Sequence, residues 1–419
     1  MPPRANNSLL TAKLRWPNTF AALRHRNYRL WFFGQTVSLM GTWMQSVAQG
    51  WLVYVLTGSE LTLGVISFLG ALPTLFLMLP AGAIADRVSK RSLLLLTQTV
   101  MTVQAFVLAS LAETNTLRMW HVGLLSFVLG VANSFDAPAR LALTVEMVED
   151  RRDLMNAIAL NSAMFNMARV VGPALGGVLL ASLGAAWCFA LNGLSFLAVL
   201  IALWLMRFPA VQQTLQSEPL AAQVKAGLSH VLHHVEVRTM IALIGVASLF
   251  GFSYSILMPA YAADVLHVGE AGLGTLNAAV GVGALVGSLV VASLASFRRK
   301  GLLLTIGSLL FPAALLLFTF SRSFLFSLAC LVVIGFAFVS EHATINTLIQ
   351  SIVPDSLRGR VMAVFSLSFF GTAPFAALQA GAVAQALGPA AGVAIGAGMT
   401  LAFSLAVLSA VPSLRRLEA

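Results

Sequence analysis

Three ionisable side chains lie inside long apolar stretches of this 419-residue chain, where charged groups are rare. Asp136 and Glu341 could each take up and release a proton, and Arg169 could attract an anion. Arg169 stands about 14 residues into its stretch, or roughly 20 Å along a helix, and an arginine at the centre of a membrane helix costs at least about 2.5 kcal/mol. Such groups are expected to face the interior of a helix bundle. For Arg169, a role in a cavity and a role as a tether between helices are equally good explanations of its presence there.

Amide and hydroxyl side chains recur on one face of the first apolar stretch. Gln45 and Gln49 lie one helical turn apart on that face, after Ser38 and Thr42, and Tyr254 lies in the seventh stretch. Polar groups in apolar helices usually face the interior, where they bond each other or a solute. For any single one of these polar side chains, a role in packing without contact to a solute is as good an explanation as a role in binding one. We expect a substrate or proton cavity lined by Gln45, Gln49, Arg169, Tyr254 and Glu341.

The composition is that of a membrane protein. Hydrophobic residues make up 58% of the chain and charged residues 10%, whereas about 25% of the residues of a soluble domain are charged. The net charge of +10 would suggest nucleic acid in a soluble protein. Here the cations concentrate between the apolar stretches, so the expected partner is a lipid bilayer and not nucleic acid.

About twelve stretches are long enough to cross a bilayer as helices, which takes about 20 residues. With the N-terminus inside and the spans alternating, 22 of the 25 Lys and Arg residues fall inside, because only Arg118 and Arg322 fall outside and Arg169 lies within a span. The positive-inside rule then places both termini in the cytoplasm. No cleavable signal peptide is expected, since the first 28 residues hold no apolar core with a cleavage site. The expected spans lie near 30–55, 61–82, 92–112, 119–139, 155–181, 187–206, 239–263, 272–296, 302–320, 324–349, 361–386 and 390–411.

The chain repeats itself at a spacing of about 205 residues. The matched pairs are Gly82 and Gly287, Gly130 and Gly335, Asp136 and Glu341, Asp150 and Asp355, and, at 204, Gly177 and Gly381. Such a repeat predicts two six-helix halves related by an axis along the membrane normal, with a binding site between them. The expected parts are a cytoplasmic segment over 1–28, a half over 29–206, a cytoplasmic linker over 207–237, a second half over 238–412 and a cytoplasmic tail over 413–419.

The expected linker carries an apolar stripe at helical spacing from Leu220 to Val235, which predicts an amphipathic helix on the membrane surface. His230 and His234 stand four residues apart, as metal ligands can. No cysteine or carboxylate completes a ligand set on that face, so a solvated polar face is the better interpretation and no metal site is expected. The sequence also lacks the phosphate-binding, zinc-protease and serine-hydrolase motifs. We therefore expect no cofactor and no enzymatic activity.

A charged turn joins the second and third apolar stretches, and it reads Gly82-Ala-Ile-Ala-Asp86-Arg87-Val-Ser-Lys90-Arg91. Its spacing resembles the loop between helices two and three of major facilitator superfamily transporters. At the position of Ser89 that family usually has a glycine. The fifth span resembles the helix-five motif of the exporter branch, with Gly172, Pro173, Gly176 and Gly177, a pattern that by itself indicates close packing and a bend. Further segments resemble bacterial siderophore and macrolide exporters, namely Arg24-His-Arg26-Asn27-Tyr28-Arg29-Leu, Gly41-Thr-Trp43-Met-Gln45, Phe135-Asp136-Ala-Pro138-Ala-Arg140 and Val353-Pro-Asp355-Ser-Leu-Arg358-Gly-Arg360-Val.

The resemblance implies a cytoplasmic gate in which Asp86 meets the start of the eleventh span, near Ser356 to Arg360, and Asp136 is held by Arg91 or Lys90. A charged partner keeps a carboxylate ionised, which leaves Glu341 as the better proton site. The implied gating residues are Gly82, Asp86, Arg87, Lys90, Arg91, Asp136 and Arg140.

The resemblance also implies a function. It is that of a secondary transporter of the bacterial inner membrane, which exports amphipathic small organic molecules, siderophore-like or drug-like, by proton antiport through alternating access. Separately, we expect the protein to be a monomer. Two alternatives stay open: a membrane scaffold or assembly factor on a transporter fold, and a carrier for nutrient uptake. Arg169, Glu341 and the glutamine face of the first span disfavour the scaffold, because they are costly to keep in a membrane.

Overall fold

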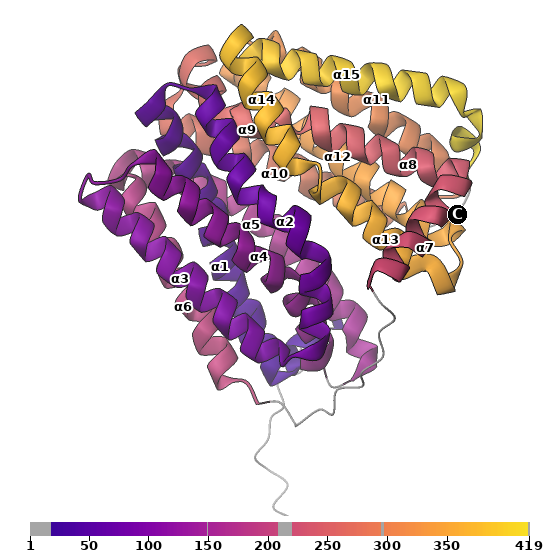
Figure 1. The fold of residues 1–419 in the computed structure, drawn as a ribbon, viewed down its shortest axis with the longest axis horizontal. Helices are drawn as coiled ribbons and strands as arrows, with labels where there is room; N and C mark the ends of the chain where they lie inside the picture. Colours follow the sequence, from indigo (N-terminus) through magenta and orange to yellow (C-terminus); the bar gives the residue numbers. More distant parts are fainter. Residues whose placement is uncertain (1–17, 149, 208–219, 295–296, 418–419) are drawn as a thin grey trace, which may run out of the picture.

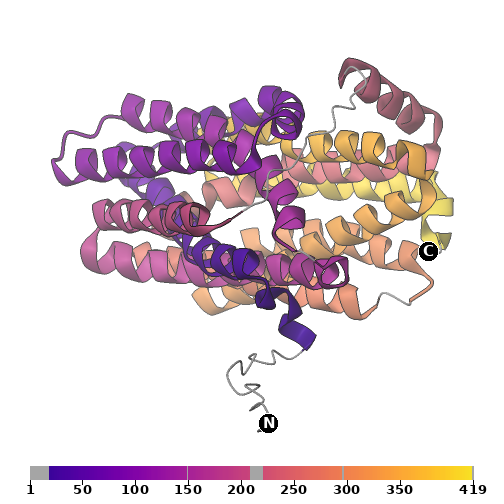
Figure 2. The same ribbon diagram turned by 90° about the horizontal axis from the view of Figure 1, so that it is seen from below.

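The computed structural model describes residues 18–148, 150–207, 220–294 and 297–417, and this part of the chain is built of helices without a strand (Figures 1 and 2). The expected N-terminal segment up to residue 17 and residues 208–219 of the expected linker lie outside the described residues. The predicted all-α membrane fold is confirmed. The long helices of the first half are α1 (Arg26–Thr57), α2 (Glu60–Arg87), α3 (Lys90–Glu113), α4 (Met119–Met147), α5 (Leu154–Leu183) and α6 (Ala185–Leu205).

The second half begins after a separate short helix, α7 (Leu220–His233). Its first span is a continuous run, Val235–Val265, in which two π-helical turns, η3 (Ala247–Gly251) and η4 (Tyr261–Val265), interrupt the α-helix. Another span, Asp355–Leu387, is interrupted at Gly371 and Thr372. The α-helices of this half are α8 (Val235–Val246), α9 (Ser253–Ala260), α10 (Gly269–Ser293), α11 (Lys300–Thr319), α12 (Phe324–Ile352), α13 (Asp355–Phe370), α14 (Ala373–Leu387) and α15 (Pro389–Ala410).

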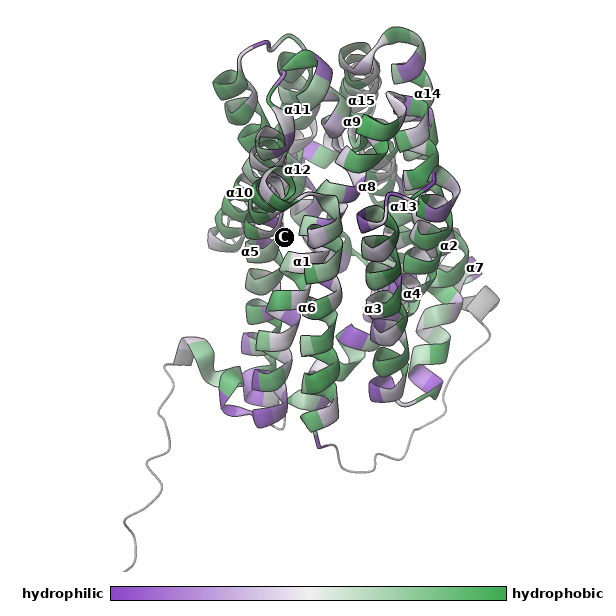
Figure 3. Ribbon diagram, turned by 90° about the vertical axis from the view of Figure 1, so that its left-hand side faces the viewer, coloured by the Kyte–Doolittle hydropathy of each residue, from purple (hydrophilic) through white to green (hydrophobic). Residues whose placement is uncertain are grey.

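Eleven helical runs of the described chain are long and apolar enough to cross a membrane. Helix α1 is a twelfth long helix, of 32 residues. It contains more polar residues than the other eleven, and Gln35, Ser38 and Gln45 among them are buried. Figure 3 shows hydrophobic residues along the whole length of the helices. Large apolar side chains are also widely exposed, such as Phe320 at 80% and Trp204 at 74%. Exposure of this kind suits helices that are surrounded by lipid.

Short polar caps fix where the helices begin and end. Helix α2 starts after Ser59, whose hydroxyl accepts a hydrogen bond from the Thr62 amide at 3.1 Å. Helix α3 starts after Ser89, whose hydroxyl accepts from the Ser92 amide at 3.3 Å. Ser89 has a φ of −60°, so this turn needs no glycine where the resemblance expects one. Each cap satisfies one backbone N–H at a helix start.

Successive long helices run in opposite directions, so their ends form two faces of the bundle. We call the end where α1 begins and α2 ends the linker face, because α7 also lies there, and the opposite end the far face. The two halves lie side by side toward the far face and diverge toward the linker face (Figure 1). The contacts between them are chiefly those of α2 with α14 and of α5 with α10.

Glycines permit both of these contacts near the far face. A Cβ added at Gly177 of α5 would lie 2.7 Å from the Cα of Gly274 of α10, and one added at Gly381 of α14 would lie 2.9 Å from the Cα of Gly64 of α2. Real side chains do not fit at such distances, so the backbones touch directly. Gly177 and Gly381 are the pair related by 204 residues, so the two contacts are copies of one arrangement.

Candidate functional site

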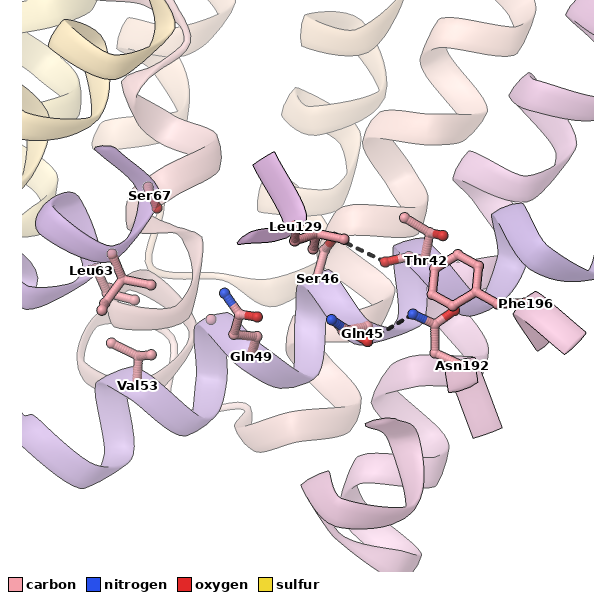
Figure 4. Close-up of a pocket in the computed structure, with 12 residues that line it drawn as sticks. Thr42, Gln45, Ser46, Gln49, Val53, Leu63, Ser67, Leu129, Asn192 and Phe196 are labelled. Atoms are coloured by element: carbon pink, nitrogen blue, oxygen red, sulfur yellow. Dashed lines mark hydrogen bonds between the residues drawn. The ribbon is translucent and has the colours of Figure 1, made fainter. Parts of the chain in front are cut away.

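A network of buried amides crosses the first half. The Asn192 side chain on α6 donates to Gln45 Oε1 at 2.7 Å, and the Gln45 amide donates to Gln104 of α3 at 3.3 Å. Gln49 donates to the Ser126 hydroxyl of α4 at 3.0 Å. Gln45 and Gln49 thus bond other side chains, and both also line a cavity of about 230 Å³ (Figure 4). This cavity lies among α1, α2, α4 and α6.

A second cavity of about 220 Å³ lies closer to the linker face and shares Thr42, Ser46 and Phe196 with the first. It contains the charged pair Asp136 and Arg140, and it has aromatic and amide walls. The other residues of its lining are Gln35, Ser38, Leu39, Trp43, Gln98, Met101, Asn133 and Phe165.

A third cavity, of about 490 Å³, lies among α1, α4 and α5 and shares Leu39, Arg140 and Phe165 with the second. Its walls are largely apolar, and Leu141 is 72% exposed there. Its polar groups include Asn161, whose amide donates to Thr144 at 3.2 Å and whose oxygen accepts from Tyr28 at 3.1 Å. Because each cavity shares lining residues with the next, the three follow α1 from the level of Val53 to that of Trp31.

Asp136 is held by groups of its own half. Its side chain is nearly buried, and Oδ1 accepts from Gln98 at 2.8 Å and from Thr97 at 3.1 Å, both on α3. Its Oδ2 lies 3.7 Å from Nε of Arg140, one turn further along α4. These bonds satisfy a carboxylate that would otherwise be costly to bury.

In this structure Asp136 does not pair with Arg91 or Lys90. Lys90 pairs with Glu146 of α4 at 3.2 Å, and Arg91 donates to the carbonyls of Leu203 at 2.8 Å and Trp204 at 3.1 Å. Both cations lie at the first turn of α3, whereas Asp136 faces residues two turns further along that helix. The two cations therefore hold the ends of α4 and α6.

The rest of the charged turn lies at the linker face. A Cβ at Gly82 would meet no neighbouring atom, and Asp86 and Arg87 are exposed where α2 ends. Asp355, at the start of α13, pairs with Arg358 at 2.5 Å. In the described part of the chain Asp86 makes no hydrogen bond or ion pair with the start of α13.

Glu341 lies inside the second half. It is 1% exposed on α12, and a Cβ at Gly307 of α11 would lie 3.0 Å from the Glu341 Cβ. Its Oε2 has no hydrogen bond in the described chain, and neither do the buried hydroxyls of Ser340 and Thr344. The neighbouring His342 ring lies 5.1 Å from the ring of Phe365 and 5.2 Å from that of Phe369. Glu341 is thus a buried carboxyl whose Oε2 has no hydrogen bond in the described chain, and it packs against α11 of its own half.

Arg169 lies between the two halves. Its Cζ is 5.8 Å from the centre of the Trp43 ring, and Tyr254 of α9 is close enough to interact with its charge. Its backbone carbonyl lies 2.6 Å from the position that a Cβ at Gly281 of α10 would occupy. The structure therefore brings together Arg169, Trp43 and Tyr254 from α5, α1 and α9.

The helix-five motif permits close packing on both sides of α5. A Cβ at Gly172 would lie 2.6 Å from the Trp43 Cβ, and one at Gly176 would lie 3.0 Å from the Met44 Cα, so both glycines allow α1 to approach. Pro173 is buried in the same helix. Gly177 faces the other way, toward α10.

Two hydrogen bonds between the halves were not expected from the sequence. Near the far face, the Trp51 indole donates to Glu270 at 3.0 Å, and the Tyr54 hydroxyl donates to Asp264. The donors come from α1, and the acceptors from η4 and α10. Asp264 directly follows the expected span 239–263, and Glu270 lies just before the expected span 272–296. The sequence therefore indicates that both acids lie at a membrane surface, but it does not indicate their partners.

The histidines of α7 do not form a metal site with other ligands in the part of the chain that is described. The rings of His230 and His234 lie 4.1 Å apart. Burial lowers the pKa of His230, and the neighbouring His234 lowers it further. Side chains of the expected stripe at Leu220 and Val224 lie outside the described residues.

A family model described as transmembrane secretion effector matches residues 17–419 of this chain. The chain belongs to this family. It is a branch of the major facilitator superfamily, so the chain is a multi-pass membrane transporter and not an enzyme, as the sequence predicted.

Curated relatives of the family match the chain over almost its full length. The multidrug efflux pump Tap of Mycolicibacterium fortuitum is 26% identical over 388 residues, which cover 90% of this chain and 94% of Tap. The enterobactin exporter EntS of Escherichia coli O157:H7 is 28% identical over 411 residues, which cover 96% of each chain. The expected resemblance to bacterial exporters is confirmed.

Solved structures share the fold at low sequence identity. A transporter of the POT family in complex with 5-aminolevulinic acid has a TM-score of 0.73 at 13% identity, over 93% of this chain and 96% of that chain. A bacterial homologue of the lysosomal transporter Spinster has a TM-score of 0.70 at 13% identity, over 95% of this chain and 96% of that chain. At this identity the likeness concerns the fold alone.

Proposed function

We propose that the protein exports amphipathic small organic molecules, siderophore-like or drug-like, across a bacterial cytoplasmic membrane by proton antiport. The observation that carries the proposal is the arrangement of the two halves, which touch near the far face, while three cavities of the first half that share lining residues follow α1 toward the linker face. Exchange between this arrangement and its opposite would give alternating access.

The cavities suit an amphipathic solute. The largest one has exposed apolar side chains such as Leu141 beside the polar side chains of Arg140 and Asn161. Sites for organic ligands are commonly apolar with a few placed polar groups.

Glu341 is our candidate for the coupling proton. An ionised carboxylate without a partner is costly to bury, and Oε2 of Glu341 has no hydrogen bond in the described chain. A site of this kind suits reversible protonation linked to a rearrangement of the helices. Asp136, in contrast, has Arg140, Thr97 and Gln98 as partners.

We place the linker face in the cytoplasm because 22 of the 25 Lys and Arg residues then lie on that side. The charged turn from Gly82 to Arg91 would belong to the gate that closes this face. Asp86 is exposed here. In the opposite arrangement it would meet the start of α13, whose free N–H groups favour an anion.

Transport in liposomes tests the proposal. Protein is reconstituted into liposomes with an acidic lumen, and a panel of amphipathic fluorescent dyes with positive, zero and negative charge is added outside. Export by antiport predicts accumulation of at least one dye beyond that in protein-free liposomes, and its loss when a protonophore collapses the gradient. Accumulation with a proton gradient of the opposite sign alone would identify uptake by symport, and no accumulation of any dye would favour the scaffold.

A further inference from the structure

Arg169 carries a guanidinium for which the described chain supplies no anionic partner. It makes no ion pair or hydrogen bond to a described side chain, and its neighbours are the Trp43 ring and Tyr254. A guanidinium has five N–H donors in a fixed plane and no acceptor. Such a group within a membrane protein normally pairs or faces a solute path. An acceptor from outside the chain would satisfy these donors.

Aromatic side chains lie next to this guanidinium. Phe165 stands one turn before Arg169 on α5, and its ring meets the Trp43 ring edge to face at a centroid distance of 6.0 Å. Both rings line the cavity of about 220 Å³, and Phe165 also lines the cavity of about 490 Å³. An aromatic ring entering either cavity would therefore find ring edges and faces within reach.

The charge around these rings is positive on balance. Asp136 and Arg140 line the second cavity as a pair, so their charges offset each other. Arg169 adds a positive charge beside Trp43 without a carboxylate partner in the described chain. Together these groups favour a ligand that is aromatic and anionic over one that is neutral or cationic.

We propose that Arg169 binds the anionic group of an aromatic substrate, such as a carboxylate, while Trp43 and Phe165 contact its ring. A planar guanidinium can donate two parallel hydrogen bonds to a carboxylate. The inference rests on the proposed export function, because it treats these cavities as the path of the exported molecule.

Binding of a matched pair of probes tests the inference. The anion 1-naphthoate and its neutral isostere 1-naphthamide are titrated at pH 7.4 against purified protein, and binding is followed by quenching of tryptophan fluorescence. We expect naphthoate to bind at least about tenfold more tightly, which corresponds to about 1.4 kcal/mol. Arg169→Gln should bring the two affinities to within about twofold, since a lost charge-assisted bond accounts for the preference. Arg169→Lys should retain part of the preference, because it keeps the charge.

Control variants separate this site from general effects. Arg322→Gln removes one charge from the loop between α11 and α12 and should leave the preference unchanged. Trp43→Leu should weaken both probes by a similar factor. An unchanged preference in Arg169→Gln with native thermal unfolding, or no preference in the wild type, overturns the inference. No gradient is applied, so a protein that prefers naphthoate but moves no dye retains this site and loses only the export proposal.

Discussion

Asp136 and Glu341 occupy equivalent positions 205 residues apart, but only Asp136 has an arginine one turn further along its helix. Arg140 Nε lies 3.7 Å from Asp136 Oδ2, whereas the corresponding position of the second half holds the apolar Ile345. Asp136 also accepts two hydrogen bonds from α3. Glu341 instead faces Gly307 of α11, which offers no side-chain donor. The two halves of the repeat thus differ at this position: Asp136 of the first half has an arginine and hydrogen-bond donors as partners, and Glu341 of the second half has no hydrogen bond at Oε2 in the described chain.

This asymmetry predicts different results from removing the two charges. Glu341→Gln keeps the shape of the side chain but cannot take up a proton, so dye accumulation driven by a pH gradient should fall by about tenfold or more. Exchange of dye across liposomes without a gradient should persist, because the path itself is unchanged. Accumulation and exchange are measured on the same preparation. Gradient-driven transport at the wild-type level would remove Glu341 from proton coupling.

Asp136→Asn is the matched variant in the other half. The amide oxygen can still accept from Gln98 and Thr97, but Arg140 loses its partner. We expect lower stability by roughly 1–3 kcal/mol, since a polar group loses a buried partner, and coupling should remain. If Asp136→Asn lost as much proton coupling as Glu341→Gln, the pairing with Arg140 would not be what excludes Asp136 from proton coupling.

Much of the fold could be predicted from the sequence because hydrophobic length and loop charge are local signals. The predicted spans near 61–82 and 302–320 became the helices Glu60–Arg87 and Lys300–Thr319. At the linker face, α2 and α4 extend beyond the predicted ends near 82 and 139, to Arg87 and Met147. Hydrophobicity marks the membrane core, and it does not mark where a helix ends in water.

The partners of the charged residues could not be predicted in the same way. Arg91 was expected at Asp136, but it donates to carbonyls at the end of α6, and that choice depends on the rotation of α3. The hydrogen bonds of Trp51 and Tyr54 connect residues more than 200 positions apart. Pairings at such separation depend on how the two halves dock, which is not a local property.

The hydroxyl of Tyr54 should stabilise the arrangement in which the far face is closed. It donates to Asp264 across the two halves, and a hydrogen bond to a charged group contributes about 1.5–3 kcal/mol. Tyr54→Phe should therefore move the population toward an open far face by about tenfold or more. Distances between spin labels at positions 116 and 323, on the far-face loops of the two halves, report the change.

Tyr28→Phe is the control for this variant. Its hydroxyl donates at 2.8 Å to the Ala157 carbonyl, within the first half alone. It should lower stability by about 1 kcal/mol without changing the label distances. If Tyr54→Phe behaves like Tyr28→Phe, the contact is not part of a gate.

The orientation of the chain can be tested by labelling single cysteines in intact cells. Cys188 and Cys330 are buried, so they give little background. A membrane-impermeant maleimide added outside should label Thr116→Cys on the far face and leave Arg416→Cys unlabelled until the cells are opened. The physical reason is the distribution of cations, from which the positive-inside rule predicts a cytoplasmic linker face. Labelling of Arg416→Cys from outside would reverse the topology, and with it the direction assigned to transport.

Closure of the far face should depend on the absence of a side chain at Gly177. A Cβ there would lie 2.7 Å from the Gly274 Cα and 2.9 Å from the Glu270 carbonyl, so Gly177→Ala must push α10 away from α5. The clash lies between the halves, and alanine favours a helix over glycine by about 1 kcal/mol. The variant should therefore fold but transport at about a third of the wild-type rate or less, because the open far face is favoured.

Two other glycines define what this result would mean. Gly381→Ala places a Cβ 2.6 Å from the Glu60 carbonyl at the related contact of α14 with α2, so it should have the same effect as Gly177→Ala. Gly398→Ala on α15 meets no atom within 4 Å and should leave transport unchanged. Dye transport, thermal unfolding and the 116–323 label distance are compared for the three variants. If Gly177→Ala and Gly381→Ala matched Gly398→Ala in transport and label distance, direct contact of the two backbones would not be needed for closure. Loss of folding in both would instead show that the glycine contacts hold the two halves together in every state.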